Sequence, residues 1–401
     1  MIYFLIYLMM LEGAVANLGF TYTDEIIVLI LIIYFVFCIL KKKLKLEVIE
    51  RRMLFSVFIF YMTGVIGVLV FDIQNDIIWS LFSGVFSIKS FLAFFGFSAF
   101  IYRKNFLIND MKKFLFIIES AEIIISILLI IDQFNPIFPM SAARFNNHSS
   151  LFIFEHSTEL ACFSILTMII SDFIRTAMRY KHKPYRNIIP TVICVIASGR
   201  FKALGFLSLY IVLRSVIPLF KKFKWQYIVF FLPISYLLVA DQIKYYLTLE
   251  QARGALIFTS FRIAIKNFPI GYGFSTFGTE FSRIRYSPLY TLYDIDKVYG
   301  LSRQFPAFIV DAMWPAILGE NGFLGLVAII FFFIEMLILI RTHITNKELF
   351  LITTLLLIYI LFESLADTIF MSSRGVAIMF IISWMIAVYK RLELNSKEIY
   401  D

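Results

Sequence analysis

Long apolar runs, each ended by a charged or turn-rich stretch, constrain the fold of this chain more than any other feature of the sequence. The runs are about 16 to 25 residues long, which is the length that a helix needs to cross roughly 30 Å of hydrocarbon. A transmembrane β-barrel would instead show alternating segments of about ten residues, which are absent. Only 16% of the residues are charged, against about 25% in soluble domains. We therefore expect an all-α, polytopic membrane protein.

Twelve runs are candidate membrane-spanning helices, and they divide the chain into three parts. Residues 1–240 hold nine spans, residues 241–312 form a large loop with short helices, and residues 313–401 hold three spans and a short tail. The apolar N-terminus has no basic segment before it, so we assign it to the first span rather than to a signal peptide. The expected spans are 2–20, 24–40, 53–71, 77–101, 114–131, 151–174, 187–198, 203–219, 225–240, 315–340, 348–366 and 375–389.

The distribution of lysine and arginine indicates the orientation of the spans. With the N-terminus in the cytoplasm, the cytoplasmic segments hold 23 of the 37 Lys and Arg residues, as the positive-inside rule requires. Both termini are then cytoplasmic, and the loop 241–312 faces outward. The net charge of +9 thus reports topology, and no motif indicates a nucleic-acid partner.

The basic residues left on the outer side are mostly arginine. Outside the spans this side has eight Arg and four Lys, whereas the cytoplasmic segments have 8 Arg and 15 Lys. Arginine is preferred where a planar fork of donors binds phosphate. Chance and loop salt bridges are the alternative explanation. The outer arginines are Arg144, Arg200, Arg253, Arg262, Arg283, Arg285, Arg303 and Arg374.

The loop 241–312 is the longest connection in the chain, and it holds seven of the 21 tyrosines. Tyrosine suits sugar binding and also the aromatic belt of a membrane interface. Residues 252–267 read as an amphipathic helix. On that helix Lys266 shares a face with Arg262, whereas Arg253 is close to half a turn out of phase, so Arg253 and Arg262 would not enter one pocket.

Four charged residues lie within or near the expected spans, where an unpaired charge is expensive. They are Lys89, Glu335, Glu363 and Asp367. Structural ion pairs or snorkelling toward the membrane surface explain them, with Asp367 pairing with Arg374 across the last outer turn, and a proton path is the alternative.

Four short stretches are similar, in content and order, to the motifs of one family. Phe152-Ile-Phe-Glu155-His156-Ser157 is similar to a Phe-Glu-Pro-Ser run in which His156 replaces the proline, and Ser198-Gly199-Arg200 resembles a Ser-Arg turn. Arg262 and Gly273 form an Arg-X10-Gly element that ends in Pro-Ile-Gly-Tyr-Gly, and residues 311–325 look like a segment that re-enters the membrane. With its large outer loop, the chain resembles the O-antigen polymerase and ligase superfamily (Wzy type) of bacterial polysaccharide assembly.

The resemblance implies a glycosyltransferase at the outer face of the bacterial cytoplasmic membrane. Proteins of this family transfer glycans from undecaprenyl diphosphate without a metal or other cofactor. The departing lipid diphosphate needs preorganised cations, and the candidates are Arg200, Arg253, Arg262 and Arg283. Lys266, Tyr272 and Gly273 complete the expected substrate-binding set.

The acceptor hydroxyl must also lose a proton, so a carboxylate or a histidine is expected to act as the general base. The first candidates are Glu155, His156 and Asp311, with Asp241 and Glu320 behind them. The implied partners are an undecaprenyl-diphosphate-linked oligosaccharide, the lipid bilayer, a chain-length-control protein and a flippase.

The histidines separate two branches of the family. Its ligases carry a histidine in the large outer loop, and none of the four histidines of this chain lies between residues 241 and 312. The sequence therefore favours a polymerase over a ligase. A lipid-linked oligosaccharide flippase is the third reading, but transporters of that kind usually show internal repeats, which we do not find here.

Overall fold

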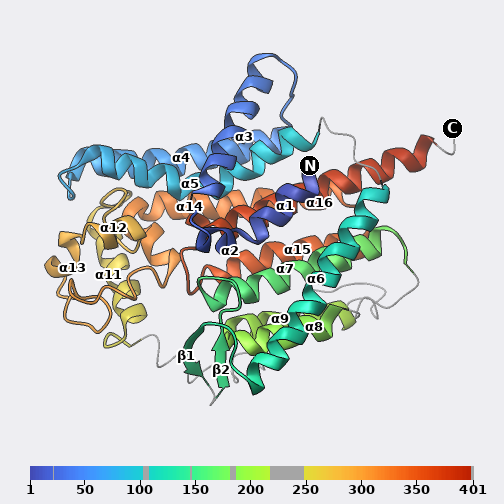
Figure 1. Ribbon diagram of the computed structural model, residues 1–401. Coiled ribbons are helices and arrows are strands. Elements are labelled where there is room, and N and C mark those ends of the chain that lie inside the picture. The colour runs from blue at the N-terminus through green and yellow to red at the C-terminus, as the bar shows by residue number, and fades with distance from the viewer. Residues whose placement is uncertain (21, 103–107, 145–146, 181–186, 217–247, 399–401) are drawn as a thin grey trace.

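The computed structural model describes residues 1–401 except 21, 103–107, 145–146, 181–186, 217–247 and 399–401 (Figure 1). The described residues form fifteen α-helices, a short 3-10 helix, η3 (Ile369–Met371), and a hairpin of β1 (Met140–Arg144) and β2 (Asn147–Ser150). The expected, mostly helical fold is confirmed. The hairpin was not predicted.

Within the described part of the chain, seven helices are long and apolar enough to cross a membrane. They are α3 (Thr23–Leu40), α4 (Val48–Phe71), α5 (Ile77–Ile101), α6 (Ile108–Phe134), α7 (Ser157–Ala177), α14 (Met313–His343) and α16 (Ser373–Glu398). The shorter helices are α1 (Ile2–Met10), α2 (Glu12–Asn17), α8 (Ile188–Ser198), α9 (Phe201–Val216), α11 (Ala252–Lys266), α12 (Glu280–Ile284), α13 (Pro288–Leu292) and α15 (Lys347–Glu363).

The expected spans differ from these helices at several places. The expected span 2–20 is not one continuous helix, because α1 ends at Met10 and α2 starts at Glu12. This break brings Gly13 against the Glu159 side chain of α7 and buries Glu12. The sixth expected span starts only at Ser157, since residues before it form turns. The span 225–240 and the end of the span 203–219 lie outside the described residues.

Most charges inside the bundle are paired between helices. Lys89 Nζ lies 2.7 Å from Asp24 Oδ2 and 2.6 Å from Glu25 Oε1, which joins α5 to α3. Glu335 of α14 pairs with Arg52 of α4 at 3.1 Å. These contacts supply the partners that the sequence analysis expected for Lys89 and Glu335, and they offset the cost of burying a charge.

The helix α14 is interrupted at Gly322, whose φ of 67° and ψ of −163° are not helical. The break leaves backbone groups of α14 without partners inside the helix, and the chain after α11 supplies them. Gly319 O accepts from Tyr272 N (3.0 Å) and Glu320 O accepts from Gly273 N (2.8 Å), while Leu324 N donates to Pro269 O (3.0 Å). The loop after α11 is thereby inserted into α14, and buried backbone groups stay hydrogen-bonded.

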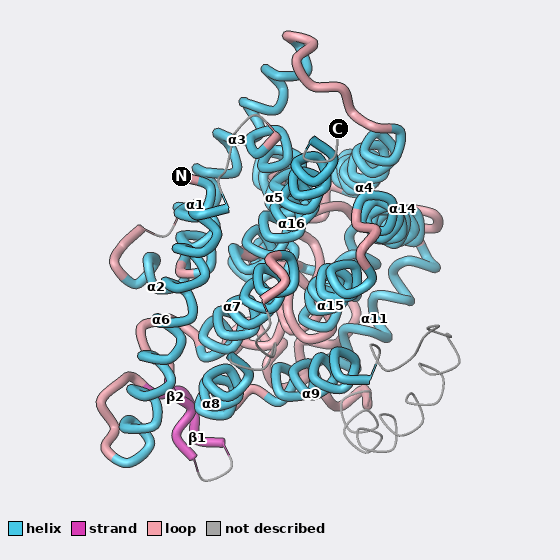
Figure 2. The backbone as a smooth tube through the Cα atoms, turned by 90° about the vertical axis from the view of Figure 1, so that its right-hand side faces the viewer, coloured by secondary structure: helices cyan, strands magenta, loops and turns pink. Residues whose placement is uncertain are grey.

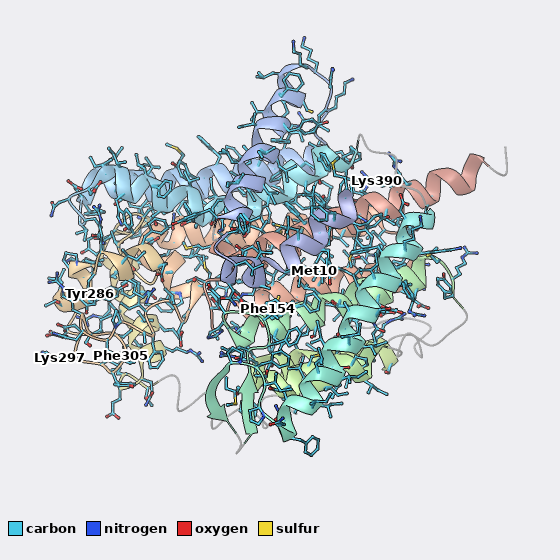
Figure 3. The ribbon with its side chains drawn as sticks, in the orientation of Figure 1. Met10, Phe154, Tyr286, Lys297, Phe305 and Lys390 are labelled. Carbon is cyan, nitrogen blue, oxygen red and sulfur yellow. The ribbon has the colours of Figure 1, made fainter. Side chains whose placement is uncertain are left out.

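The two ends of the bundle differ in composition. Figure 3 places Tyr286, Lys297 and Phe305 at one end, where α11, α12 and α13 lie over the helix ends, and Lys390 toward the other. Near Lys390, the N-cap residue of α4, Glu47, binds Lys390 Nζ (3.1 Å) and His343 Nε2 (3.0 Å). The segment from Ala252 to Val310 has a small hydrophobic core of its own. Because this segment lies over one end of the bundle, we call it the cap.

Candidate functional site

Polar side chains from several helices meet at the capped end of the bundle, where α7, α9, α14 and α16 begin and α15 ends. The start of α14 is fixed to the end of α15, because Met313 N donates to Ser364 O (3.2 Å) and Trp314 Nε1 donates to Ser364 Oγ (3.0 Å). We call this group the charged cluster. Its members are His156, Arg200, Lys202, Arg253, Asp311, Glu363, Asp367 and Arg374.

His156 and Arg200 are in direct contact within the cluster. The chain reverses between α8 and α9 at Gly199, and this turn directs Arg200 toward the start of α7. Arg200 Nε donates to Ser157 Oγ (2.8 Å), and Arg200 Nη2 lies 3.0 Å from His156 Nε2. Since a guanidinium can only donate, the imidazole accepts from Arg200, while Nδ1 accepts from Thr158 N (3.4 Å) and lies 2.9 Å from Thr158 Oγ1.

The ends of α9, α15 and α16 are joined by a network of two cations and two carboxylates. Glu363 is 1% exposed, and its Oε2 lies 2.7 Å from Lys202 Nζ and 3.5 Å from Arg374 Nη1. Arg374 Nη2 also binds Asp367, the pair that the sequence analysis expected. Because each carboxylate has a cationic partner, the network fixes Lys202 and Arg374 beneath the Arg200 turn.

Arg253 and Asp311 form the most exposed ion pair of the cluster. Arg253 Nη2 donates to Asp311 Oδ2 at 3.3 Å, and the two side chains are 30% and 32% exposed. Lys202 and Asp367 also act on the Asp311 carboxyl, which ties this pair to the network around Glu363. An anionic ligand could therefore take Arg253 from Asp311 and leave the carboxylate available to accept a proton.

The titratable groups of the cluster are shifted in different directions. Burial, together with the charges of Arg200 and Arg374, lowers the pKa of His156 to about 4, so this imidazole is neutral near pH 7 and a weak base. Burial raises the pKa of Asp311, although Arg253 opposes the shift. For Asp367, burial opposes ionisation, but Arg374 and Lys202 outweigh it and lower the pKa. Of these groups, Asp311 is the better candidate for a general base.

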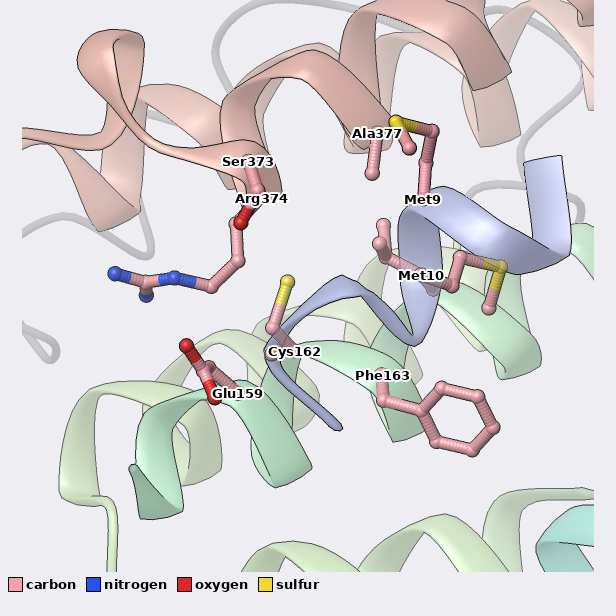
Figure 4. A pocket seen from close by; sticks show the side chains of 10 residues that line it. Met9, Met10, Glu159, Cys162, Phe163, Ser373, Arg374 and Ala377 are labelled. Carbon is pink, nitrogen blue, oxygen red and sulfur yellow. The ribbon is translucent and has the colours of Figure 1, made fainter. Parts of the chain in front are cut away.

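A small cavity lies directly beside the cluster (Figure 4). The side chains of Arg374 and Glu159 point toward the same space, with Cys162 between their helices. Its volume of about 10 Å³ suffices for one water molecule. The cavity is thus too small for a substrate, and a sugar or diphosphate would have to bind on the open side of the cluster.

A second group of predicted site residues lies along α11, apart from the cluster. The helix is unbroken, and Arg262 contacts Tyr293, with its guanidinium carbon 5.4 Å from the ring centre. Tyr293 Oη is 3.5 Å from Tyr272 Oη, and Lys266 acts on Tyr272 from the end of the helix. The structure therefore brings Arg262, Lys266 and Tyr272 together, but it does not bring them to Arg200 and Arg253.

The other predicted residues have different surroundings. Arg283 pairs with Glu280 within α12, and Glu155 is exposed. Gly273 has a φ of 92°, and a Cβ atom there would lie 2.2 Å from Val68 N, so its position in the motif has a structural reason. Glu320 is 1% exposed and accepts hydrogen bonds from Thr276 N (3.0 Å), Phe277 N (3.2 Å) and Thr279 Oγ1 (2.9 Å). It holds the loop after α11 rather than facing a ligand. Asp241 lies outside the described residues.

Sequence reasoning did not include Lys202 and Arg374 among the site residues. Lys202 follows Arg200 by two positions at the start of an apolar helix, and Arg374 starts the last one. The available signal was their place at helix ends, opposite the acids Glu363 and Asp367.

The fold and the cluster define a helical, membrane-embedded protein with a group of ionic side chains at one end of its bundle. No protein-family model matches the chain, and no curated protein sequence matches it either.

Proposed function

We propose that this protein is an integral-membrane glycosyltransferase that polymerises a bacterial surface polysaccharide. It would transfer a growing glycan from undecaprenyl diphosphate to another lipid-linked repeat unit at the outer face of the cytoplasmic membrane. The observation that carries the proposal is the charged cluster at one end of an apolar helical bundle, in which Arg253 pairs with Asp311 and further cations lie on the adjoining helix ends. These cations are Arg200, Lys202 and Arg374. The order of family-like motifs in the sequence supports it.

In the proposed reaction, Asp311 accepts the proton of an acceptor sugar hydroxyl. The hydroxyl oxygen then bonds to the anomeric carbon of the donor glycan, and the bond from that carbon to the phosphate oxygen breaks. The electron pair leaves with the lipid diphosphate, whose growing charge is stabilised by Arg200 and Arg253. Lys202 and Arg374, held by Glu363, would act as positioning residues for these groups.

The proposed topology has twelve crossings, with both termini in the cytoplasm and the cap facing outward. The seven long helices account for most of these crossings, and α8, α9 and α15 are apolar but shorter. A flippase would supply the lipid-linked repeat unit on the outer side, and a chain-length-control protein would act on the polymer.

The test is the length of the surface glycan in cells that carry replacements in the cluster. Arg200→Gln and Arg253→Gln should each leave mainly single repeat units, with polymer reduced at least a hundredfold, as expected when a charge-stabilising group is lost. Lys297→Gln is the matched control, because Lys297 is 75% exposed and pairs with Asp294, three residues away, so its ladder should stay normal. A full-length ladder from both cluster variants would overturn the proposal.

An assay with purified protein and a synthetic undecaprenyl-diphosphate repeat unit distinguishes a polymerase from a ligase and from a flippase. A polymerase makes a product ladder on the carrier. A ligase makes none unless a lipid acceptor is added, and a flippase consumes no substrate. In cells, loss of a flippase would trap repeat units inside, whereas loss of a polymerase displays single units outside.

A further inference from the structure

The helix α11 lies across the bundle rather than along it. Figure 2 looks along the axes of α14, α15 and α16, whereas α11 is seen from the side at the edge of the molecule. Its far end is fixed to the break in α14, since Pro269 O accepts from Leu324 N (3.0 Å). A helix that crosses the ends of membrane-spanning helices has the orientation of an interfacial helix, which lies in the plane of the membrane.

One face of α11 exposes a continuous apolar stripe. Phe258, Phe261 and Ile265 are 46%, 47% and 67% exposed, and their spacing places them on one side of the helix. Phe268, just after the end of the helix, is 72% exposed. The opposite face, with Leu256 and Ile263 fully buried, packs on the rest of the protein. The stripe is therefore the side that meets lipid chains.

Two cations, Arg262 and Lys266, border this stripe one turn apart. Both side chains are exposed, and among the described residues neither has a carboxylate within ion-pair distance. Beside Arg262 is a cleft of about 380 Å³, lined by Thr259, Tyr293 and Asp294 as well as by the apolar side chains of Phe258 and Val298. The Asp294 carboxylate pairs with Lys297 (2.8 Å). Small-molecule sites have volumes of about 300 Å³ or more, so the cleft has room for a phosphate-bearing headgroup and part of its chain.

We propose that α11 is an interfacial helix that binds the phosphate of an anionic phospholipid of the surrounding leaflet through Arg262 and Lys266. The apolar stripe enters the acyl region, and the two cations reach the headgroup level, as long basic side chains do at a membrane surface. The inference does not depend on the proposed transferase activity, because the lipid is a resident of the membrane and not a substrate.

The first test compares lipid binding by the purified full chain and by a double variant. Phosphatidylglycerol and phosphatidylcholine are added in turn, and bound lipid is counted by native mass spectrometry. We expect Arg262→Gln with Lys266→Gln to bind phosphatidylglycerol about tenfold to thirtyfold more weakly, which is the worth of two cations near an anionic surface. Arg285→Gln with Arg303→Gln removes the same charge elsewhere on the cap, since Arg285 pairs with Asp76, and this variant should bind like the parent protein.

Equal binding of the two lipids by the parent protein would overturn the proposal, and so would a loss of the same size in the control double variant.

A second measurement tests the position of the helix. A fluorophore on Ile265→Cys, in vesicles of phosphatidylglycerol brominated in its acyl chains, should be quenched, and one on Lys297→Cys should not. An unquenched Ile265 label would contradict an in-plane α11. Inorganic phosphate at equal concentration should not displace the lipid, and displacement would show a free-anion site instead.

Discussion

At the scale of single residues, Asp311 has the most consequence for a reaction. Its carboxyl is partly withdrawn from water and pairs with Arg253, which in the proposed reaction also binds the lipid diphosphate. A carboxylate base works only when ionised, so activity should be present above the pKa of Asp311 and should be lost as the pH falls through it. Because burial raises that pKa above its usual value, the loss should begin at a higher pH than for a solvent-exposed aspartate.

Replacing Arg253 should move the acid side of the pH–rate profile. The Arg253 charge favours the ionised form of Asp311, so Arg253→Gln should shift the acid midpoint of the pH–rate profile to higher pH, apart from any fall in rate. Polymer formation by purified protein, measured across the acid range, gives both quantities. Lys297→Gln should leave the midpoint unchanged. An Arg253→Gln midpoint that stays in place, or moves to lower pH, would show that Asp311 is not the titrating base.

Residue-level features of the site could be read from the sequence only in part. The outer arginines and Asp311 could be found, because charge at the end of an apolar run is unusual and visible. Arg200 contacts His156, whereas Arg262 contacts neither of these two residues. Both facts depend on how α7, α9 and α11 pack, and spacing along the chain carries no such information. Lys202 was missed because its partner, Glu363, lies far away in sequence.

At the scale of elements, the loop after α11 and the break in α14 form one unit. Gly273→Ala should destabilise this unit, because the new Cβ would meet the α4 backbone at Val68 N and the φ of 92° is unfavourable for alanine. The backbone conformation alone costs about 1–3 kcal/mol. Gly205→Ala is the matched control, since Gly205 lies in α9 with its nearest neighbour at 3.8 Å, and alanine there should be neutral or stabilising. Thermal unfolding in detergent, followed by size-exclusion chromatography, compares them. Equal melting temperatures for the two variants would argue against the inserted loop.

The pair of helices α3 and α5 provides a second test at this scale. Lys89→Met leaves Asp24 and Glu25 without their cation, and breaking a buried pair in this way costs about 3–5 kcal/mol. Adding Asp24→Asn and Glu25→Gln should restore much of the lost stability, because the triple variant leaves no unpaired charge. If the triple variant is no more stable than Lys89→Met in the same unfolding measurement, the ion pair does not join these helices.

Element boundaries show where sequence patterns stop being informative. Helices such as α5 and α14 were predicted well, because apolar runs of that length have few alternatives in a membrane. The division of residues 2–20 into α1 and α2 was missed, since Glu12 is a single polar residue whose burial depends on α7 and α16. The break at Gly322 lies within an apolar run, and only the inserted loop makes it favourable.

At the scale of the whole molecule, the helical bundle followed from hydropathy, while the cap did not. The composition of the loop 241–312 indicated function, but its helices α12 and α13 are short and depend on packing among Tyr290, Phe277 and Leu301. The number of crossings stays a prediction, because residues 217–247 are not described. What the structure adds is the gathering of ionic helix ends on the capped side, opposite the end that holds Glu47, His343 and Lys390.

The sidedness of that arrangement can be measured directly. The three native cysteines, Cys38, Cys162 and Cys194, are buried, so they should give little background with a maleimide. Lys297→Cys on the cap should react with a membrane-impermeant maleimide added to intact cells, because the positive-inside rule puts the cap outside. Lys347→Cys, exposed at the opposite end, should react only after the membrane is made permeable. If both positions are labelled from the same side, the chain does not cross the membrane an odd number of times between them. If Lys347→Cys alone is labelled in intact cells, the topology is inverted and a reaction at the outer face is excluded.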